Sequence, residues 1–189
     1  WFTLRFKDED IDNEDEAKLW LEEATATMYT AFNRSNFQQE IFELYHDLIT
    51  FGTAAMFIEE DDEDFIKFST RHIDEVYIAE NDKGRIDTIY RRFNLSARAV
   101  VQKFGTAVSQ DILVLEKKDP YKEVEIIHAV YPRADFNPTK KDKKNMPFES
   151  VYMEYKNGNE LSVSGFKEFP FVVPRSLKAS HEIYGRSPA

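Results

Sequence analysis

Apolar residues recur at helical spacing near the start of the chain and form one stripe between residues 17 and 32. The stripe consists of Ala17, Trp20, Leu21, Ala24, Met28, Ala31 and Phe32. This period predicts an amphipathic helix with one buried face. Asn13, with Glu16 three residues later, has the composition of a capping box, so the helix is expected to begin there.

A second helical stripe follows after a short break at residues 33–36. Its members are Phe37, Ile41, Leu44, Tyr45 and Leu48. Ser35 with Gln38 repeats the capping arrangement, and Gly52 is suited to end the helix. The short link predicts two helices that meet at a turn, as antiparallel or angled neighbours.

After Gly52 the apolar period changes to that of strands. The run from Ala54 to Ile58 is continuous and of strand length, and Phe65 to Phe68 resumes it after six consecutive acidic residues. The acidic run at residues 59–64 is therefore predicted to connect two strands.

Turn-forming residues punctuate the remaining chain. Asn81 to Gly84 predicts a hairpin between residues 76–79 and 85–93, and Asn157-Gly158 predicts another between residues 148–155 and 160–164. Ser96 and Gly105 are placed to begin and end a short helix. Residues 123–131 read as a further strand, and residues 132–147 as an exposed loop.

These elements together predict an α+β fold: an N-terminal helical pair followed by short, mostly antiparallel strands with one inserted short helix. Residues 1–52 form the expected helical segment, and residues 53–189 the expected β-rich region. The pattern at residues 106–122 predicts no definite element.

Composition supports a folded chain and narrows its chemistry. Hydrophobic residues make up 42% of the 189 positions, which is enough for a sizeable core, and there is no cysteine for thiolate metal sites or disulfides. No apolar run approaches bilayer-spanning length. The chain starts at Trp1 without a signal-peptide pattern, so we expect a piece of a longer protein.

The net charge of −10 is distributed unevenly along the chain. Residues 1–64 contain 18 acidic and 4 basic side chains, whereas residues 65–189 contain 17 acidic and 21 basic ones. An acidic surface repels phosphate, so the balance argues against a domain that grips DNA tightly.

Motifs for catalysis are missing, and one cluster leaves a metal site open. The six glycines form no phosphate-binding loop, and the four histidines have no metal-ligand spacing. The acidic run contains Glu59, Asp61, Asp62 and Asp64, residue types that a two-magnesium nuclease uses. Consecutive acids point in diverging directions, so a solvated turn is the favoured interpretation, with an incidental Ca²⁺ or Mg²⁺ site as the alternative.

Two basic features are candidates for phosphate contact. The lysines of residues 140–144 lack interleaved aromatic residues, so they predict no stacking platform for single strands. Arg91 and Arg92 are adjacent in a predicted strand, where alternation places them on opposite faces. No continuous binding stripe, and no specific DNA-contacting residue, is predicted.

Ordered phrases along nearly the whole chain resemble the head-to-tail connector, or portal, family of short-tailed bacteriophages. They run in this order: residues 51–56, 58–61, 77–81, 84–88, 90–91, 96–98, 100–101, 104–105, 128–133, 147–148, 150–152, 169–171, 173–175 and 184–189, with Glu182. Each phrase is short, and the consistent order of the set makes the resemblance specific.

The resemblance implies a structural, non-enzymatic subunit, normally one of twelve in a ring at one capsid vertex. Such rings serve as the conduit for DNA packaging and ejection, in a virion assembled in the host bacterial cytoplasm. The implied partners are identical subunits, the packaging terminase, tail adaptors, capsid or scaffold proteins, and double-stranded DNA that passes without sequence-specific binding. No cofactor and no membrane is implied, and the chain is expected to lie in the outer wing region.

Two other classes of function stay open at this point. The acidic run is compatible with a metal-dependent phage nuclease or hydrolase. A monomeric protein-binding module would also suit an acidic α+β domain without catalytic motifs.

Overall fold

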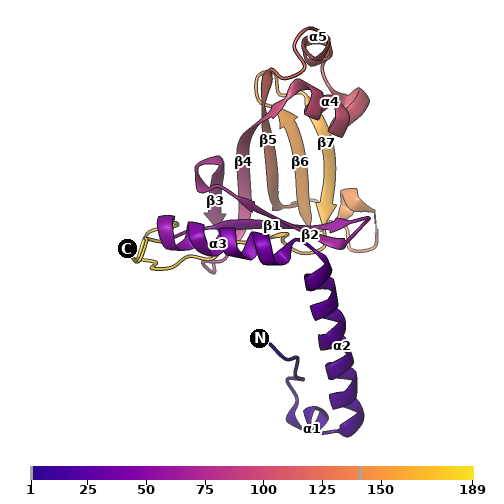
Figure 1. Cartoon of the computed structure of the whole chain (residues 1–189), viewed down its shortest axis with the longest axis vertical. Coiled ribbons are helices and arrows are strands. Elements are labelled where there is room, and N and C mark those ends of the chain that lie inside the picture. The colour runs from indigo at the N-terminus through magenta and orange to yellow at the C-terminus, as the bar shows by residue number, and fades with distance from the viewer. Residues whose placement is uncertain (1, 141) are drawn as a thin grey trace.

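The computed structural model describes residues 2–140 and 142–189 and has an α+β architecture (Figure 1). The helices are α1 (Glu9–Asp12), α2 (Asp15–Arg34), α3 (Phe37–Phe51), α4 (Ala97–Phe104) and α5 (Gln110–Lys118), with 3₁₀ turns η1 (Ile73–Glu75), η2 (Gly105–Ala107) and η3 (Lys143–Asn145). The α+β prediction is confirmed.

The strands form two antiparallel sheets. They are β1 (Ala55–Asp61), β2 (Phe65–Arg71), β3 (Val76–Glu80), β4 (Ile86–Ser96), β5 (Glu123–Pro132), β6 (Phe148–Glu154), β7 (Glu160–Phe166) and β8 (Phe171–Val172). The larger sheet has the order β3-β4-β5-β6-β7, and the smaller has the order β2-β1-β8. The small sheet and α3 lie across one end of the large sheet, and α4 and α5 lie at the other end (Figure 1).

Strand β1 is buried on both faces, which explains its continuous apolar run. Ala55 and Phe57 pack with Ile89 and Val130 of the large sheet. On the opposite face, Met56 packs with α3. The small sheet is therefore a middle layer between the large sheet and α3.

A second core covers the other end of the large sheet. Phe93 and Ile126 of the sheet pack against Val100 of α4 and Ile112 of α5. The carboxylate of Glu154 on β6 holds the start of α5, because it accepts hydrogen bonds from Ser109 N at 2.8 Å and Ser109 Oγ at 2.7 Å. Helix α5 was not anticipated, because its apolar residues 112–115 are consecutive and so do not by themselves show a helical period.

Helix α2 projects away from both sheets (Figure 1). Only Leu21 of its residues is buried. Residues 2–6 return along it, with Phe2 stacked on Tyr29 at 4.9 Å and Phe6 stacked on Trp20 at 5.9 Å between ring centroids. The predicted pair of helices is present, and α2 and α3 meet at an angle rather than side by side (Figure 1).

The predicted start of α2 at Asn13 is wrong. Asn13 instead ends α1, a short helix that was not predicted, and its amide donates to Glu9 O at 3.1 Å. Glu14 occupies the cap position of α2 without a side-chain cap bond. At α3 the cap residue is Asn36, although Ser35 Oγ does accept from Phe37 N at 3.2 Å.

The shorter turns and the inserted helix follow the sequence closely. Ser96 Oγ accepts from Ala99 N at 3.3 Å to cap α4, and Gly105 ends it with φ +57°. The β3–β4 and β6–β7 hairpins form across Asn81 to Gly84 and Asn157-Gly158. These predictions are confirmed.

Candidate functional site

The acidic run lies at the tip of the β1–β2 hairpin. Glu59 and Asp61 belong to β1, where they pair with Lys67 and Phe65, so the run is strand as well as connection. Asp61 Oδ2 accepts from Asp64 N at 3.0 Å and from Glu63 N at 3.1 Å. These two backbone bonds hold the pKa of Asp61 below its ordinary value. The carboxylate of Asp61 therefore closes the turn.

The structure does not gather the four candidate ligands into a metal site. Asp62 and Asp64 are exposed at the turn, and Glu59 lies two strand positions before Asp61. Within residues 2–140 and 142–189, no group of three or more His, Cys, Asp or Glu is placed to hold a metal ion. Among the described residues, no contact at this hairpin favours nuclease chemistry.

The lysine-rich loop is organised by a carboxylate of its own. Asp142 accepts from Asn145 Nδ2 at 2.9 Å and from Lys144 N at 3.0 Å, and the bond from Asn145 is the main cause of its lowered pKa. Lys141, which belongs to the predicted basic cluster, lies outside the described residues.

A polar row crosses the large sheet between its two apolar cores. Arg91 on β4 pairs with His128 on β5, which pairs with Tyr152 on β6. The His128 and Tyr152 rings stack at 3.9 Å with an interplanar angle of 3°, and His128 Nε2 lies 2.9 Å from Ser150 Oγ. Arg91 Nε donates to Glu75 Oε2 at 2.8 Å.

Burial controls the protonation of this row. Desolvation, followed by the charges of Lys103, Arg91 and Arg71, lowers the pKa of His128 to about 3, so its imidazole is neutral at pH 7. Desolvation also raises the pKa of Tyr152 to about 12. The stacked His128 and Tyr152 rings are therefore both neutral at pH 7, and we call this pair of rings the uncharged floor.

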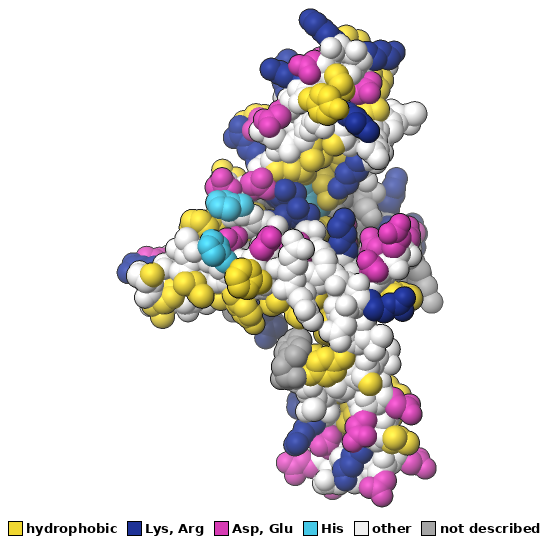
Figure 2. Space-filling model, in the orientation of Figure 1, with side chains coloured by type: hydrophobic (Ala, Val, Ile, Leu, Met, Phe, Trp, Pro, Cys, Tyr) yellow, Lys and Arg dark blue, Asp and Glu magenta, His cyan; other side chains and the backbone are white. Residues whose placement is uncertain are grey.

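The charges of Lys103, Arg91 and Arg71 act on this floor, and the charge of Lys67 acts on Lys103. We call these four cations the basic band. They come from β2, β4 and α4. Lys103 Nζ lies 4.6 Å from the centre of the Tyr152 ring. Figure 2 shows Lys and Arg side chains gathered between the small sheet and the end of the molecule that holds α4 and α5.

The basic band was not predicted from the sequence, but the placement of Arg91 relative to Arg92 was. Arg91 and Arg92 do lie on opposite faces, because Arg92 Nε donates to Glu125 Oε1 at 2.5 Å while Arg91 binds Glu75. Strand alternation correctly separated these two arginines. It carried no signal that Arg71 and Lys103 would join Arg91 from other elements.

Helices α2 and α3 expose large apolar side chains. On α3, Phe42 is 74% exposed, and Tyr45 and Ile49 lie on the same side of the helix. On α2, Leu19 and Trp20 are each 59% exposed. Exposed apolar side chains in such a group are typical of surfaces that contact other protein.

Comparisons with known proteins identify the family of the chain. Residues 1–189 match the family described as bacteriophage head to tail connecting protein. The chain belongs to that family. The resemblance recognised in the sequence is therefore confirmed.

Two curated relatives of the connector family match almost the whole chain. The "Portal protein" of Salmonella phage epsilon15 is 36% identical over 191 residues, covering 99% of this chain and 34% of that protein. The "Probable portal protein" of Bordetella phage BPP-1 is 32% identical over 193 residues, covering all of this chain and 35% of that protein. The chain spans about a third of the length of these relatives.

No helix within residues 2–140 and 142–189 has the length and apolar character needed to cross a membrane.

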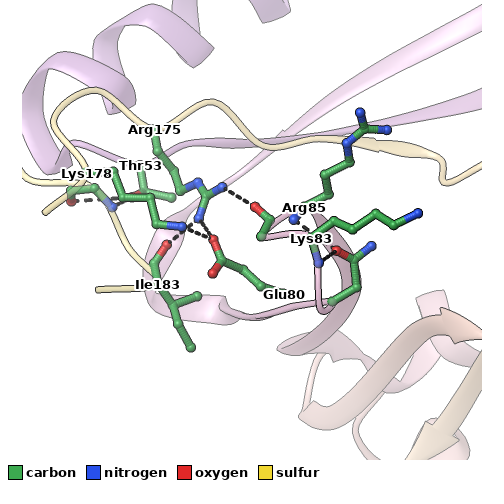
Figure 3. Close-up of polar contacts among 10 residues, drawn as sticks. Thr53, Glu80, Lys83, Arg85, Arg175, Lys178 and Ile183 are labelled. Atoms are coloured by element: carbon green, nitrogen blue, oxygen red, sulfur yellow. Dashed lines mark hydrogen bonds and ion pairs between the residues drawn. The ribbon is translucent and has the colours of Figure 1, made fainter. Parts of the chain in front are cut away.

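In this connector-family chain, the C-terminal residues 175–187 form hydrogen bonds and ion pairs with the start of the small sheet and with the β3–β4 hairpin (Figure 3). Both Arg175 and Lys178 bond to Glu80, and Arg175 also donates to Ile183 O at 2.9 Å. Thr53 Oγ1 accepts from Gly185 N at 2.7 Å. The bonds from Arg175 and Lys178 lower the pKa of Glu80.

Replacing Glu80 with Gln is expected to loosen residues 175–187, because Arg175 and Lys178 lose their shared anion. The amides of Leu177 and Arg186, which bond across this segment, should exchange hydrogen faster in mass spectrometry. Glu60→Gln is the control, since Glu60 is exposed at the hairpin and its side chain forms no hydrogen bond or ion pair in the described chain. Equal exchange in both variants would contradict the role of Glu80.

Proposed function

We propose that this chain is part of the subunit of a phage portal, a structural ring at one capsid vertex. The observation that supports this most strongly is the family match along all 189 residues, together with two relatives named as portal proteins. In this role the ring is a passive conduit for DNA during packaging and ejection. The proposal involves no catalytic residue, cofactor or metal ion.

The proposed place of the chain is the outer wing of the subunit. Residues 1–52 form its helical segment, and residues 53–189 form the β-rich wing and stem-proximal region. The projecting α2 and the exposed apolar side chains of α3 suit this place, because a ring subunit needs surfaces that extend beyond its own core. The remaining two thirds of the subunit supply other parts of the ring.

The proposed partners follow from the same role. Identical subunits form the ring, with twelve expected, and the packaging terminase docks on it and supplies the ATP chemistry. Tail adaptors and capsid or scaffold proteins contact its outer surfaces, and double-stranded DNA passes through it. The assembled ring belongs to the virion and forms in the host bacterial cytoplasm.

The acidic balance of the chain is compatible with DNA passage. A portal must let a polyanion move in both directions, so many cation–phosphate contacts would hinder it. With 35 acidic against 25 basic side chains, the surface as a whole repels phosphate.

Particle shape tests the proposal. The complete gene product is expected to form rings with a central hole in negative-stain images, and to sediment as a large homo-oligomer. A subunit that stays monomeric at micromolar concentration, or that hydrolyses a substrate by itself, would contradict the proposed function.

A further inference from the structure

The basic band carries more positive charge than its surroundings neutralise. Glu75 forms an ion pair with Arg91 at 2.8 Å. Glu59 pairs in register with Lys67 across β1 and β2. Within residues 2–140 and 142–189, no ion pair within 4.0 Å is formed by Lys67, Arg71 or Lys103. Asp61, whose pKa is lowered mainly by two backbone hydrogen bonds and further by the charge of Lys67, is a third carboxylate near the band. Three carboxylates thus face four cations.

The cations of the band also act on one another. Partial burial lowers the pKa of Arg91 first, and the neighbouring charge of Arg71 lowers it further. Loss of water lowers the pKa of Lys103, which is then raised by Glu59 and lowered by Arg71, Arg91 and Lys67. Like charges held this close are stabilised by an anion, which relieves their repulsion.

Among residues 2–140 and 142–189, the largest group of exposed carboxylates close together in sequence is at the free end of α2. We call residues 7–18 the acidic tip; they contain seven carboxylates and two lysines. Asp10, Glu14 and Glu16 are all exposed, and Trp20, 59% exposed, lies one turn further along the helix. Figure 2 shows Asp and Glu side chains gathered at this end of the molecule.

The acidic tip cannot reach the basic band of its own chain. Helix α2 has 20 residues and extends away from the side of the molecule that holds α4 (Figure 1). At 1.5 Å per residue its length is about 30 Å, so it holds the tip well clear of the band. The complementary contact is therefore available only between two copies.

We infer that the basic band of one copy binds the acidic tip of α2 from a neighbouring copy. This rests on the proposed function, since it assigns one contact of the ring. The two surfaces differ, so the contact is head-to-tail, and such contacts close into rings when the rotation between subunits permits. Trp20 beside the tip and Phe104 with Tyr152 beside the band provide an aromatic component.

A second copy suits the band better than DNA does. Duplex DNA presents a long row of phosphates, and its binding requires many cations along its path. The band is short and contains Glu59 and Glu75. An acidic helix end needs only a compact group of cations, which the band supplies.

Charge reversal in the full-length subunit tests the contact. The band variant is Lys67→Glu with Lys103→Glu, both exposed. The tip variant is Asp10→Lys with Glu14→Lys, both exposed and without a side-chain hydrogen bond or ion pair in the described part of the chain. Each variant is expected to lower the yield of rings about tenfold or more, because the coupling energy of a close charge pair across an interface corresponds to a change of that size in affinity. Negative-stain counting and sedimentation measure the yield.

Restoration by the combined changes separates a specific contact from damage to the fold. A chain with all four substitutions should recover rings, and so should co-expression of the band variant with the tip variant, because each reversed surface then meets an opposite charge. Lys140→Glu with Lys144→Glu, in the loop before β6, is the matched control and should assemble normally.

The outcomes distinguish this contact from the proposed function. Rings from the wild type together with normal rings from both reversal variants would overturn the contact and leave the proposed function standing. Failure of the four-substitution chain and of the mixture to restore rings would also overturn it. If the band variant assembled normally but lost salt-sensitive binding to duplex DNA, the band would be a DNA surface instead. A wild type that never forms rings would overturn both.

Discussion

Replacing His128 with Phe together with Ser150 with Ala is expected to flatten the dependence of stability on pH between about pH 6 and pH 5. His128 is 2% exposed and its pKa is lowered to about 3, mainly by burial. In the unfolded chain a histidine has a pKa of about 6.5. Below that value the unfolded state takes up a proton that the folded state excludes.

The direction of the effect follows from this difference. The stability contributed by neutral His128 is complete above about pH 6.5 and falls as the pH drops toward the folded-state value of about 3. The loss approaches about 1.4 kcal/mol per pH unit. Urea unfolding at about pH 7, 6 and 5 measures this slope.

His128 and Ser150 are replaced together because they share one buried hydrogen bond. Ser150 is 3% exposed and shares its hydrogen bond with His128, so removing only one partner would leave a buried polar group unsatisfied. The window stops at about pH 5 because Glu80 and Glu154, whose pKa values are lowered, begin to lose their own contribution below the ordinary Glu value. Parallel slopes in wild type and variant would show that His128 is not the group responsible.

Replacing Gly52 with Ala is expected to lower the free energy of unfolding by on the order of 3 kcal/mol, from backbone strain and from lost hydrogen bonds. Gly52 has φ +78°, and a Cβ there would lie 2.1 Å from the carbonyl carbon of Arg186. The segment around Arg186 must then move. Its movement breaks bonds such as those of Gly52 O with Ser176 N and of Ile49 O with Ser187 Oγ.

Gly84→Ala is the matched control for this substitution. Gly84 also has positive φ, at +71°, but a Cβ there meets no atom within 4 Å. It should cost only the backbone term, about 1 kcal/mol. Thermal unfolding separates the two, since each kcal/mol lowers Tm by roughly 2–4 °C in a chain of this size. Equal Tm losses would mean that residues 185–187 do not pack on Gly52 as described.

The helices and hairpins were predictable because their signals are local. The stripes that predicted α2 and α3 reflect a period of 3.6 residues, and Asn81 to Gly84 encodes a turn directly. One error lay where two local signals competed. Asn13 can cap a following helix or end a preceding one, and in the structure it ends α1, while Asp12 of α1 accepts a hydrogen bond from Phe6 N.

The candidate site was less predictable than the fold. Residues 59–64 were the candidate metal site because six acids in sequence are conspicuous, and the structure shows a hairpin turn closed by Asp61. The basic band has no such signature. Its members are separated by up to 36 positions and are interrupted by apolar residues of two cores.

By itself, the sequence determined most of the local elements, the α+β class and the family, because periodicity, turn residues and ordered phrases are properties of neighbouring positions. Only the tertiary structure decided which charges meet. The packing of the small sheet and α4 onto one face of the large sheet brings β2, β4 and α4 together, while α2 carries the acidic tip away from them. Burial of His128 and the closeness of Arg71 to Arg91 follow from that packing, since desolvation and Coulomb interactions depend on distance in space and not on separation along the chain.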